Sequence, residues 1–351
     1  NGVGKTSFVD AFSLLSASAS GRLSSALSQL GGVSSLLTRD RAQDISFLVD
    51  MEDPGHNPLK YELCLSQKGS GYFISRELLS QIREGFPEPF KHIDSHDGDI
   101  RYFAGEDRTL LRPDWEHNPL ETSLSQVPKM FQQPEGLRRT LGSATLYHGL
   151  DVGPRAPVKL PQQMKPAVLQ GVNGEDLVPF LYYLRESDRD RYEAIEDTLA
   201  IAFPGFEALS FPPVAAGMLA MTWKERYFKK PLFMNELSEG TLRFIWLVSL
   251  LQSPGLSTIA MIDEPEVSLH PEQLSILADL MRETAKRTQL IVATHSDRLI
   301  RFLRPDEVVV MDIGENGCTN VTWADTLDLD DWLVDYSLDE VWRLGRMGGR
   351  P

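Results

Sequence analysis

Four short motifs, three in the last third of the chain and one at its first residues, constrain the fold more than any other feature. Leu-Ser-Glu-Gly-Thr occupies residues 237–241, an apolar segment then ends in Asp263-Glu264-Pro265, and Ala-Thr-His-Ser follows at residues 293–296. The first seven residues, which read as the second half of a phosphate-binding loop, are Asn1, Gly2, Val3, Gly4, Lys5, Thr6 and Ser7. The order of these motifs predicts that the two ends of the chain meet around a triphosphate.

Each residue type in the N-terminal motif has a physical reason to face phosphate. Gly2 and Gly4 let the backbone wrap closely around phosphate oxygens, Lys5 supplies a cation, and the Thr6 hydroxyl suits magnesium. We expect residues 5–16 to form a helix whose first N–H groups point at the anion. Taken alone, the segment also fits an ordinary helix start. The motif needs an upstream glycine and strand, so we expect the chain to be an N-terminally cut fragment.

The C-terminal motifs place polar groups directly after apolar segments. Asp263 is suited to magnesium, and Glu264 can accept a proton from an attacking water. His295 follows another apolar segment, where its imidazole can donate a hydrogen bond to a γ-phosphate. Ser238 can cap a helix that begins near Gly240, and this helix start can face an anion. Taken singly, these are a solvated strand end, a structural histidine and an ordinary N-cap; together they favour catalysis.

The secondary-structure pattern changes along the chain. Residues 44–126 contain short β-rich segments separated by Pro, Gly and Asp, which predicts an antiparallel sheet. After residue 240, helices alternate with strands that end near residues 262, 293 and 311, which predicts a largely parallel α/β sheet. We expect three parts: an N-terminal lobe, an inserted mixed α/β segment and a C-terminal lobe, at residues 1–135, 136–235 and 236–351.

Together the motifs resemble those of the ABC-type ATPases, in the branch that contains RecF, SMC and OLD-like proteins and stand-alone ATPases related to them. The resemblance rests on the phosphate loop, Leu-Ser-Glu-Gly-Thr, Asp-Glu-Pro-Glu-x-x-Leu-His-Pro and Thr-His-Ser. It implies a P-loop NTPase fold of the α/β class: an ABC-type head with a largely parallel core sheet, an antiparallel β subdomain and a helical insertion.

In that family two subunits enclose two ATP molecules with Mg²⁺. The resemblance implies that Ser238 and Gly240 contact the γ-phosphate held by Lys5 and Thr6 of a second copy, so that ATP joins a homodimer. The family also has a glutamine after a strand that touches magnesium or water. Our candidate is Gln126, which follows residues 122–125.

The resemblance also implies a role: an ATP-hydrolysing switch in DNA repair or anti-phage defence, acting in the cytoplasm on DNA or on a separately encoded effector nuclease. The alternative is the ATPase subunit of a membrane transporter, which the long interval between Lys5 and Ser238 disfavours. A nucleotide sensor that does not hydrolyse ATP would be expected to lack Glu264. No apolar segment is long enough to span a bilayer, and two cysteines are too few for a disulfide framework.

The net charge of -15 is unevenly distributed. Residues 305–342 contain eleven Asp or Glu and no Lys or Arg, so the remainder of the chain can still carry a local basic patch. One cluster of four cations encloses two aromatic residues: Lys224, Arg226, Tyr227, Phe228, Lys229 and Lys230. The cluster can contact a nucleic-acid backbone, but an exposed charged turn explains the same residues, and both interpretations stay open here.

Overall fold

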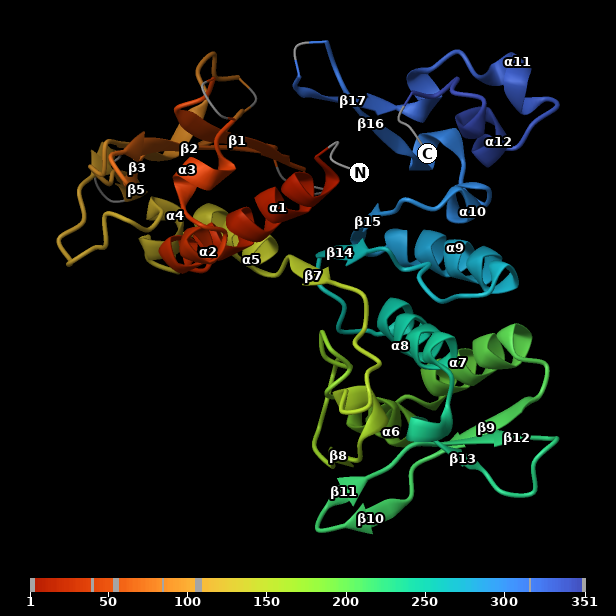
Figure 1. Ribbon diagram of the computed structural model, residues 1–351. Helices are drawn as coiled ribbons and strands as arrows, with labels where there is room; N and C mark the ends of the chain where they lie inside the picture. Colours follow the sequence, from red (N-terminus) through yellow and green to blue (C-terminus); the bar gives the residue numbers. More distant parts are fainter. Residues whose placement is uncertain are drawn as a thin grey trace. The chain divides into compact units, whose positions relative to one another are not determined.

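The computed structural model of the protein describes residues 4–38, 41–52, 57–83, 85–104, 109–315 and 317–348. The chain forms two compact units, one made of Asn1–Phe8 and Thr145–Pro351 and the other of Val9–Ala144 (Figure 1). We call them the discontinuous unit and the inserted unit. The division falls at residue 144, and residues 145–235 join the C-terminal part in one unit. The expected boundaries at residues 135 and 235 stay a prediction.

A six-stranded antiparallel sheet, with its strands in sequence order, dominates the inserted unit and confirms the predicted sheet. Its strands are β1 Asp44–Met51, β2 Leu59–Lys68, β3 Gly71–Gln81, β4 Phe90–His96, β5 Tyr102–Ala104 and β6 Thr109–Leu111. The helices are α1 Lys5–Ala19, which begins in the discontinuous unit, α2 Leu23–Gln29, α3 Val33–Leu36, α4 Ser123–Gln126 and α5 Gln132–Gly142.

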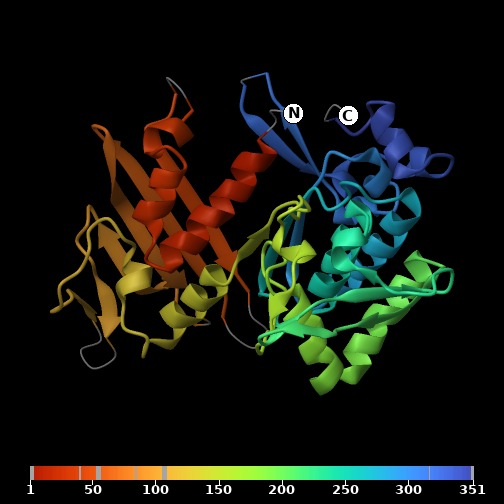
Figure 2. The same ribbon diagram turned by 60° about the horizontal axis from the view of Figure 1, so that its bottom comes forward.

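One face of this sheet carries the core of the inserted unit. Alternate residues of β2, among them Tyr61, Leu63 and Leu65, are fully buried, as expected where successive side chains point to opposite faces. They belong to one apolar cluster with residues of α1, α2 and α5. Figure 2 shows these helices on one side of the strands.

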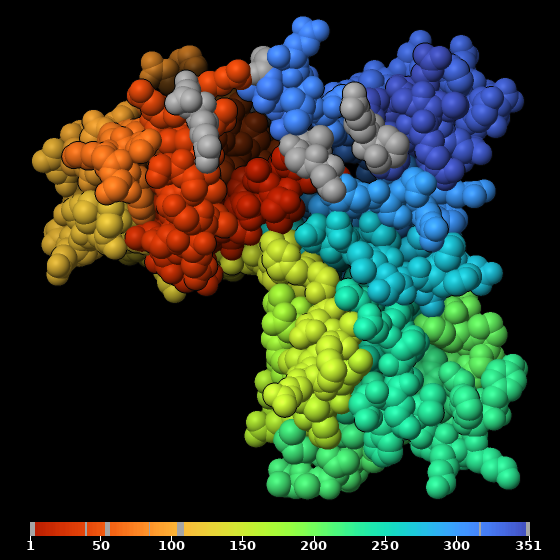
Figure 3. Space-filling model, in the orientation of Figure 1, coloured from red at the N-terminus to blue at the C-terminus, as the bar shows by residue number. Residues whose placement is uncertain are grey.

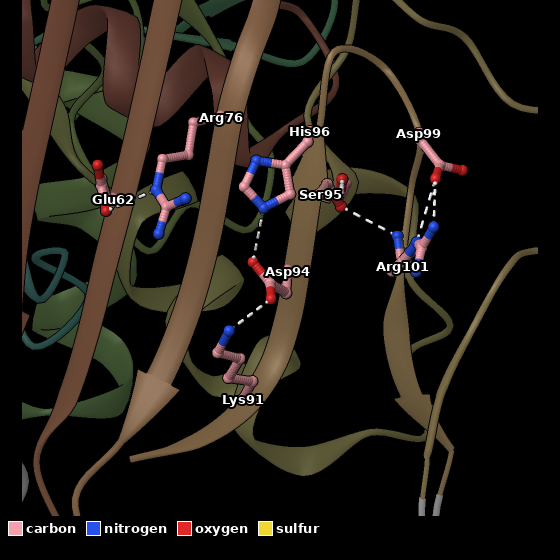
Figure 4. A network of polar contacts seen from close by, with 9 residues as sticks. Glu62, Arg76, Lys91, Asp94, Ser95, His96, Asp99 and Arg101 are labelled. Atoms are coloured by element: carbon pink, nitrogen blue, oxygen red, sulfur yellow. Dashed lines mark hydrogen bonds and ion pairs between the residues drawn. The ribbon is translucent and has the colours of Figure 1, made fainter. Parts of the chain in front are cut away.

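On the other face of the sheet, charged side chains pair with one another (Figure 4). Arg76 Nε lies 3.1 Å from Glu62 Oε2, across β2 and β3. On β4, Asp94 accepts hydrogen bonds from Lys91 at 2.7 Å and from the His96 ring at 3.1 Å. Beyond it, Arg101 pairs with Asp99 at 3.0 Å. We call these residues the outer-face network.

The discontinuous unit is built around a three-stranded parallel sheet in the order β15-β14-β7. Its strands are β7 Thr145–Tyr147, β14 Ile259–Asp263 and β15 Gln289–Ala293. The helices that accompany it are α6 Leu177–Ser187, α7 Arg189–Ala202, α8 Glu239–Gln252, α9 Pro271–Ala285 and α10 Asp297–Ile300. The predicted alternation of helices with the strands ending at 262 and 293 is therefore confirmed.

The helix α8 lies at the centre of this unit. Residues Phe244–Leu251 are all buried, although a surface helix would alternate between apolar and polar faces. They form one cluster with residues of α6, α7, α9 and β14. A helix buried on all sides is held firmly, because each buried large apolar side chain contributes about 1.5–3 kcal/mol to stability.

One predicted strand does not join the parallel sheet. The segment expected to end at residue 311 is β16 Val309–Ile313, which pairs antiparallel with β17 Thr319–Trp323 in a separate two-stranded sheet. The amide of Gly314 donates to the Cys318 carbonyl at 2.8 Å, so the chain turns back at once and supplies its own partner strand. The expectation that this segment extends the parallel sheet is wrong.

The remaining elements of the discontinuous unit are short. One small antiparallel sheet contains β8 Gln162–Gln163, β10 Pro213–Ala215 and β11 Met218–Leu219. A second contains β9 Phe206–Ser210, β12 Thr222–Glu225 and β13 Leu232–Phe233. The C-terminal helices are α11 Asp330–Leu333 and α12 Leu338–Arg343. Within the described ranges, none of the helices has the length and apolar character needed to cross a membrane.

Candidate functional site

The site begins where α1 starts. Gly4 has a φ of +94°, a conformation that side chains disfavour, and a Cβ there would lie 2.7 Å from Thr319 Oγ1. Lys5 is the first helical residue, as the sequence predicts, and Thr6 follows it as an exposed residue. Of the seven residues in the predicted phosphate loop, Asn1, Gly2 and Val3 lie outside the described residues.

Three parallel strands bring their carboxyl ends to one edge of the sheet. In the register, Ile262 of β14 stands beside Tyr147 of β7, and Asp263 stands beside Ala293 of β15. The polar residues that follow each strand therefore gather at this edge. They are His148 after β7, Glu264 after β14, and Thr294 and His295 after β15.

Lys5 reaches the polar residues that follow β15. Its ammonium lies 2.7 Å from His295 Nδ1 and donates to the Thr294 carbonyl at 3.2 Å. Burial lowers the pKa of Lys5, against the opposing charges of Glu264, Glu266 and Asp263. The beginning of the chain and its last third therefore do converge in the discontinuous unit.

His295 is held between a cation and a carboxylate. Its Nδ1 faces Lys5, and its Nε2 lies 3.9 Å from Glu264 Oε1. Burial, followed by the charge of Lys5, lowers the pKa of His295, so the neutral ring is favoured. Because the ammonium can only donate, a neutral His295 accepts at Nδ1 and carries its proton on Nε2.

Glu264 stands in a strained backbone conformation directly before Pro265. Its φ is +47°, in the left-handed region that residues other than glycine rarely adopt, while its amide still donates to the Ala293 carbonyl at 2.8 Å. That hydrogen bond continues the strand pairing by one residue, and the positive φ then turns the chain. Strained residues of this kind cluster at functional sites, and the carboxylate itself is 46% exposed.

A third carboxylate, Glu266, holds the loop after β15. Thr294 Oγ1 donates to Glu266 Oε1 at 2.5 Å and accepts from the Ser296 amide at 2.9 Å, which fixes the segment that carries His295. Burial raises the pKa of Glu266. Its other oxygen, Oε2, is buried and meets no hydrogen-bond partner among the described residues. The sequence showed Glu266 within the Asp-Glu-Pro-Glu motif, but residue type alone did not assign it this supporting position.

The Leu-Ser-Glu-Gly-Thr motif forms the start of α8. The Ser238 hydroxyl accepts from the Thr241 amide at 3.1 Å, as an N-cap does. A Cβ at Gly240 would lie 2.4 Å from the carbonyl oxygen of Ser268, in the turn before α9, so only glycine fits here. The predicted contact of Ser238 and Gly240 with nucleotide on a second copy stays a prediction.

Gln126 does not directly follow a strand, contrary to the pattern on which it was chosen. Residues 123–126 form α4, and the Gln126 amide donates to the carbonyls of Asn118, Glu121 and Thr122. The strand that neighbours β14 on the side opposite β15 is β7, and the residue after it is His148. Its Nδ1 lies 3.9 Å from Asp263 Oδ2.

His148 lines a small pocket with the two carboxylates of the Asp-Glu pair. The other polar residue of this pocket is Arg243 from α8, whose Nε is buried and finds no hydrogen-bond partner within the described part of the chain. Sequence reasoning missed His148, since a three-residue strand gives little periodic signal. The signal available was the ligand-like imidazole directly after the Thr-Leu-Tyr segment at residues 145–147.

The donor set suits magnesium with a nucleotide. Asp263 is 42% exposed and Thr6 is exposed, so both oxygens are accessible. Magnesium is usually bound by one or two carboxylates together with substrate phosphates and waters, so a dense cage of side chains is not required. In the described ranges, no group of three or more His, Cys, Asp or Glu is placed to hold a metal ion by itself.

Comparison with known proteins gives a family and a fold. The model of a family described as "AAA domain, putative AbiEii toxin, Type IV TA system" matches residues 1–301. Among solved structures, the chain is similar to an SMC head bound to the C-terminal winged-helix domain of ScpA. The identity is 13%, the match covers 95% of this chain and 90% of that chain, and the TM-score is 0.53. No curated protein matches the chain.

Two further SMC heads are similar at lower TM-scores. The SMC head domain from Thermotoga maritima is 13% identical, covers 92% of this chain and 86% of its own, and has a TM-score of 0.39. A head domain with an extended coiled coil from Pyrococcus furiosus is 12% identical, with coverages of 98% and 90% and a TM-score of 0.43. The match to the first head shows the fold, and the predicted fold class, an α/β fold of the P-loop NTPase kind with a parallel core sheet and an antiparallel β subdomain, is confirmed.

Proposed function

Because the chain belongs to the family described as "AAA domain, putative AbiEii toxin, Type IV TA system", we propose that this SMC-like P-loop ATPase binds ATP with Mg²⁺ at the start of α1 and hydrolyses it. One observation carries the proposal. Lys5 Nζ lies 2.7 Å from His295 Nδ1, and His295 Nε2 lies 3.9 Å from Glu264 Oε1, so groups with three different roles share one small volume.

The nucleotide would be held by the N-terminal loop. Its proposed residues are Asn1, Gly2, Val3, Gly4, Lys5, Thr6 and Ser7. Lys5 would exchange its contacts with His295 and the Thr294 carbonyl for the β- and γ-phosphates, which are stronger partners for a cation. The first amides of α1 would add donors and the positive end of the helix dipole.

Glu264 is the proposed general base. Its carboxylate is accessible to water, and the positive φ at this residue fixes the direction in which the side chain leaves the strand. It would accept a proton from the attacking water. His295, with its proton on Nε2, would donate a hydrogen bond to the γ-phosphate on the same side.

Thr6 and Asp263 are the proposed protein ligands of magnesium. The ion, when bound, would neutralise the charge that develops on the phosphate oxygens. His148 lies 3.9 Å from the Asp263 carboxylate and would orient it, directly or through a water. We place His148 in the role for which a glutamine was expected.

Hydrolysis would require two copies of the chain. Ser238 and Gly240, at the start of α8, would contact the γ-phosphate bound by Lys5 of the second copy, so that ATP joins a head-to-tail pair. The family description, which names a putative toxin of a type IV toxin–antitoxin system, supports a switch in anti-phage defence over one in DNA repair. DNA or a separately encoded effector in the cytoplasm would respond to the nucleotide state of the ATPase.

A mixing experiment tests the shared site. Lys5→Ala should lose ATP binding in a titration, and Ser238→Arg should bind ATP but not hydrolyse it, because the arginine blocks the second copy's nucleotide. Mixed in equal amounts, the two inactive variants form some dimers with one intact site. Phosphate release should then recover to at most about a quarter of the wild-type rate.

Two outcomes would contradict the proposal. If Lys5→Ala binds ATP with wild-type affinity, the phosphate loop is misassigned. If the mixture is no more active than its parents, while Ser238→Arg alone binds ATP normally, the site is not shared between copies. Mixing Lys5→Ala with Glu62→Gln, a variant of the outer-face network, serves as the positive control, because Glu62→Gln should remain active by itself.

A further inference from the structure

The loop between β12 and β13 carries five of the six residues in the cluster of cations and aromatic residues whose role the sequence left open; Lys224 lies on β12. The loop comprises residues 226–231, all of them exposed. The loop extends at the lower right of Figure 1, and side chains of this segment project there in the space-filling view (Figure 3). We call it the β12–β13 loop.

Aromatic residues at the two ends of this hairpin behave in opposite ways. Trp223 on β12 is fully buried, with its ring 4.4 Å from that of Phe206, and it anchors the hairpin in the core. Tyr227 and Phe228, a few residues later, are 73% and 52% exposed. Folding therefore buries the first ring and leaves two adjacent rings largely in water, and adjacent exposed apolar groups can mark an interaction site.

The exposed rings stand on an ordered loop. The Arg226 amide donates to the Gly205 carbonyl at 3.0 Å, and the Phe228 amide donates to the Glu225 carbonyl at 3.2 Å. A Cβ at Gly205 would lie 3.0 Å from Tyr227 Cε2, so the glycine makes room for one edge of the tyrosine ring. The loop is thus fixed at its base while both of its rings remain largely exposed.

The cations of the loop are available, whereas the neighbouring acids are engaged. Lys224, on the strand, pairs with Glu207 at 2.8 Å, and Glu225 accepts from the Trp223 indole at 2.8 Å. Arg226, Lys229 and Lys230 form no ion pair with any residue that the structure describes, although the Arg226 guanidinium lies over the Tyr227 ring, 5.9 Å from its centroid. A chain with a net charge of -15 therefore presents three cations without a carboxylate partner in the described ranges, beside two exposed rings.

We propose that the β12–β13 loop binds an unpaired nucleic-acid strand, whose phosphates contact Arg226, Lys229 and Lys230 and whose bases stack on Tyr227 and Phe228. Phosphates complement the cations in charge. Duplex DNA would leave the rings without a use, because its bases are already stacked, whereas unpaired bases stack readily on aromatic side chains. The proposal names the partner of the ATP-driven switch, so its importance rests on the proposed function.

The experiment is a fluorescence-anisotropy titration of the full chain with a labelled single-stranded oligonucleotide and with its duplex, over a series of salt concentrations. We expect the wild type to bind the single strand more tightly than the duplex. Tyr227→Ala/Phe228→Ala should weaken single-strand binding at least tenfold, from the loss of stacking. Lys229→Ala/Lys230→Ala should also weaken single-strand binding. It should reduce the slope of log affinity against log salt concentration by about 1.4, for two lost phosphate contacts.

Matched controls are Lys60→Ala/Lys286→Ala and Tyr336→Ala, which remove exposed residues of the same types elsewhere. These should bind as the wild type does. Three results would each overturn the proposal: no binding by the wild type at low salt, equal binding by all variants, or duplex binding as tight as single-strand binding and indifferent to the rings. Because the titration needs no ATP, its failure is distinguishable from failure of the proposed ATPase, which phosphate release by the same loop variants measures separately.

Discussion

In the antiparallel sheet of the inserted unit, charged side chains pair with one another across neighbouring strands, whereas at the carboxyl ends of β7, β14 and β15 they meet without full pairing. In the antiparallel sheet, Asp94 accepts hydrogen bonds from both Lys91 and His96. At the strand ends, Glu266 Oε2 and Arg243 Nε are buried and find no hydrogen-bond partner in the described ranges, and Glu264 holds a strained φ.

The two regions contain similar residue types, so composition does not separate them. What differs is whether the charges are satisfied by the protein itself. Because its charges are already paired, the outer-face network stabilises the fold modestly and offers no unpaired group to a ligand. Unsatisfied groups cost stability and persist where a bound molecule completes them. The contrast supports a ligand site at the strand ends and a structural role for the sheet face.

The largest effect is expected for Glu264→Gln. Removing the general base should lower phosphate release by about 10²- to 10⁴-fold, while ATP binding is kept and ATP-dependent dimers, measured by light scattering, become more abundant. Glu62→Gln removes a carboxylate from the outer-face network and should leave turnover unchanged. Undiminished turnover in Glu264→Gln would reject the assigned base, and equal losses in both variants would break the contrast between the regions.

An intermediate effect is expected for His148→Ala. Each region offers a histidine near an aspartate: His148 lies 3.9 Å from Asp263, and His96 lies 3.1 Å from Asp94. Loss of His148 should weaken the Mg²⁺ dependence of ATP binding and lower turnover by about tenfold, in line with residues that orient metal ligands. His148→Gln should recover part of the loss, since an amide can still donate.

His96→Ala is the control for this prediction and should alter neither quantity. Magnesium titrations of ATP binding separate a local effect on the site from a loss of folded protein. If His148→Ala keeps the wild-type magnesium midpoint and turnover, then His148 does not support Asp263, and the role expected of a glutamine is filled elsewhere.

The smallest effect is expected for Asp94→Asn in the outer-face network. Burial opposes ionisation of Asp94, but the hydrogen bond and charge of Lys91, together with His96, lower its pKa below the ordinary 3.8. A carboxylate whose pKa is lower in the folded state contributes stability above pH 3.8 and loses that contribution as the pH falls through the folded value. Asp94→Asn should therefore cost less than about 1 kcal/mol at pH 7.

Urea unfolding at pH 7 and at pH 3 measures the contribution of Asp94 to the free energy of unfolding. The variant should be less stable than the wild type at pH 7, and the difference should shrink at the lower pH. A turnover defect in Asp94→Asn, with folding intact, would show that the outer face contributes to the chemistry after all.

Local patterns were enough to predict much of the fold. The starts of α1, α8 and α9 and the ends of β14 and β15 are marked by capping residues, apolar runs and prolines close to each boundary. Pairing between distant segments was not marked in this way. β7 spans only three residues and pairs with a strand more than one hundred positions later, and β16 pairs with its own hairpin partner.

The site was predicted unevenly for the same reason. Lys5, Asp263, Glu264 and His295 lie in motifs that are readable one at a time, and the structure brings them together. The position of His148 at the site depends on which strand neighbours β14. No local sequence pattern indicates that pairing. Searching for a glutamine by residue type led instead to Gln126, whose amide is occupied with the carbonyls of its own loop.

The close approach of Gly240 to the Ser268 carbonyl has a mechanical consequence. The absence of a side chain at residue 240 lets the first turn of α8 rest directly on the peptide that follows the Asp-Glu strand end. Backbone pressed against backbone cannot give way as a flexible side chain would. A displacement of the first turn of α8 would therefore be expected to shift the peptide at Ser268, in the segment that follows Glu264.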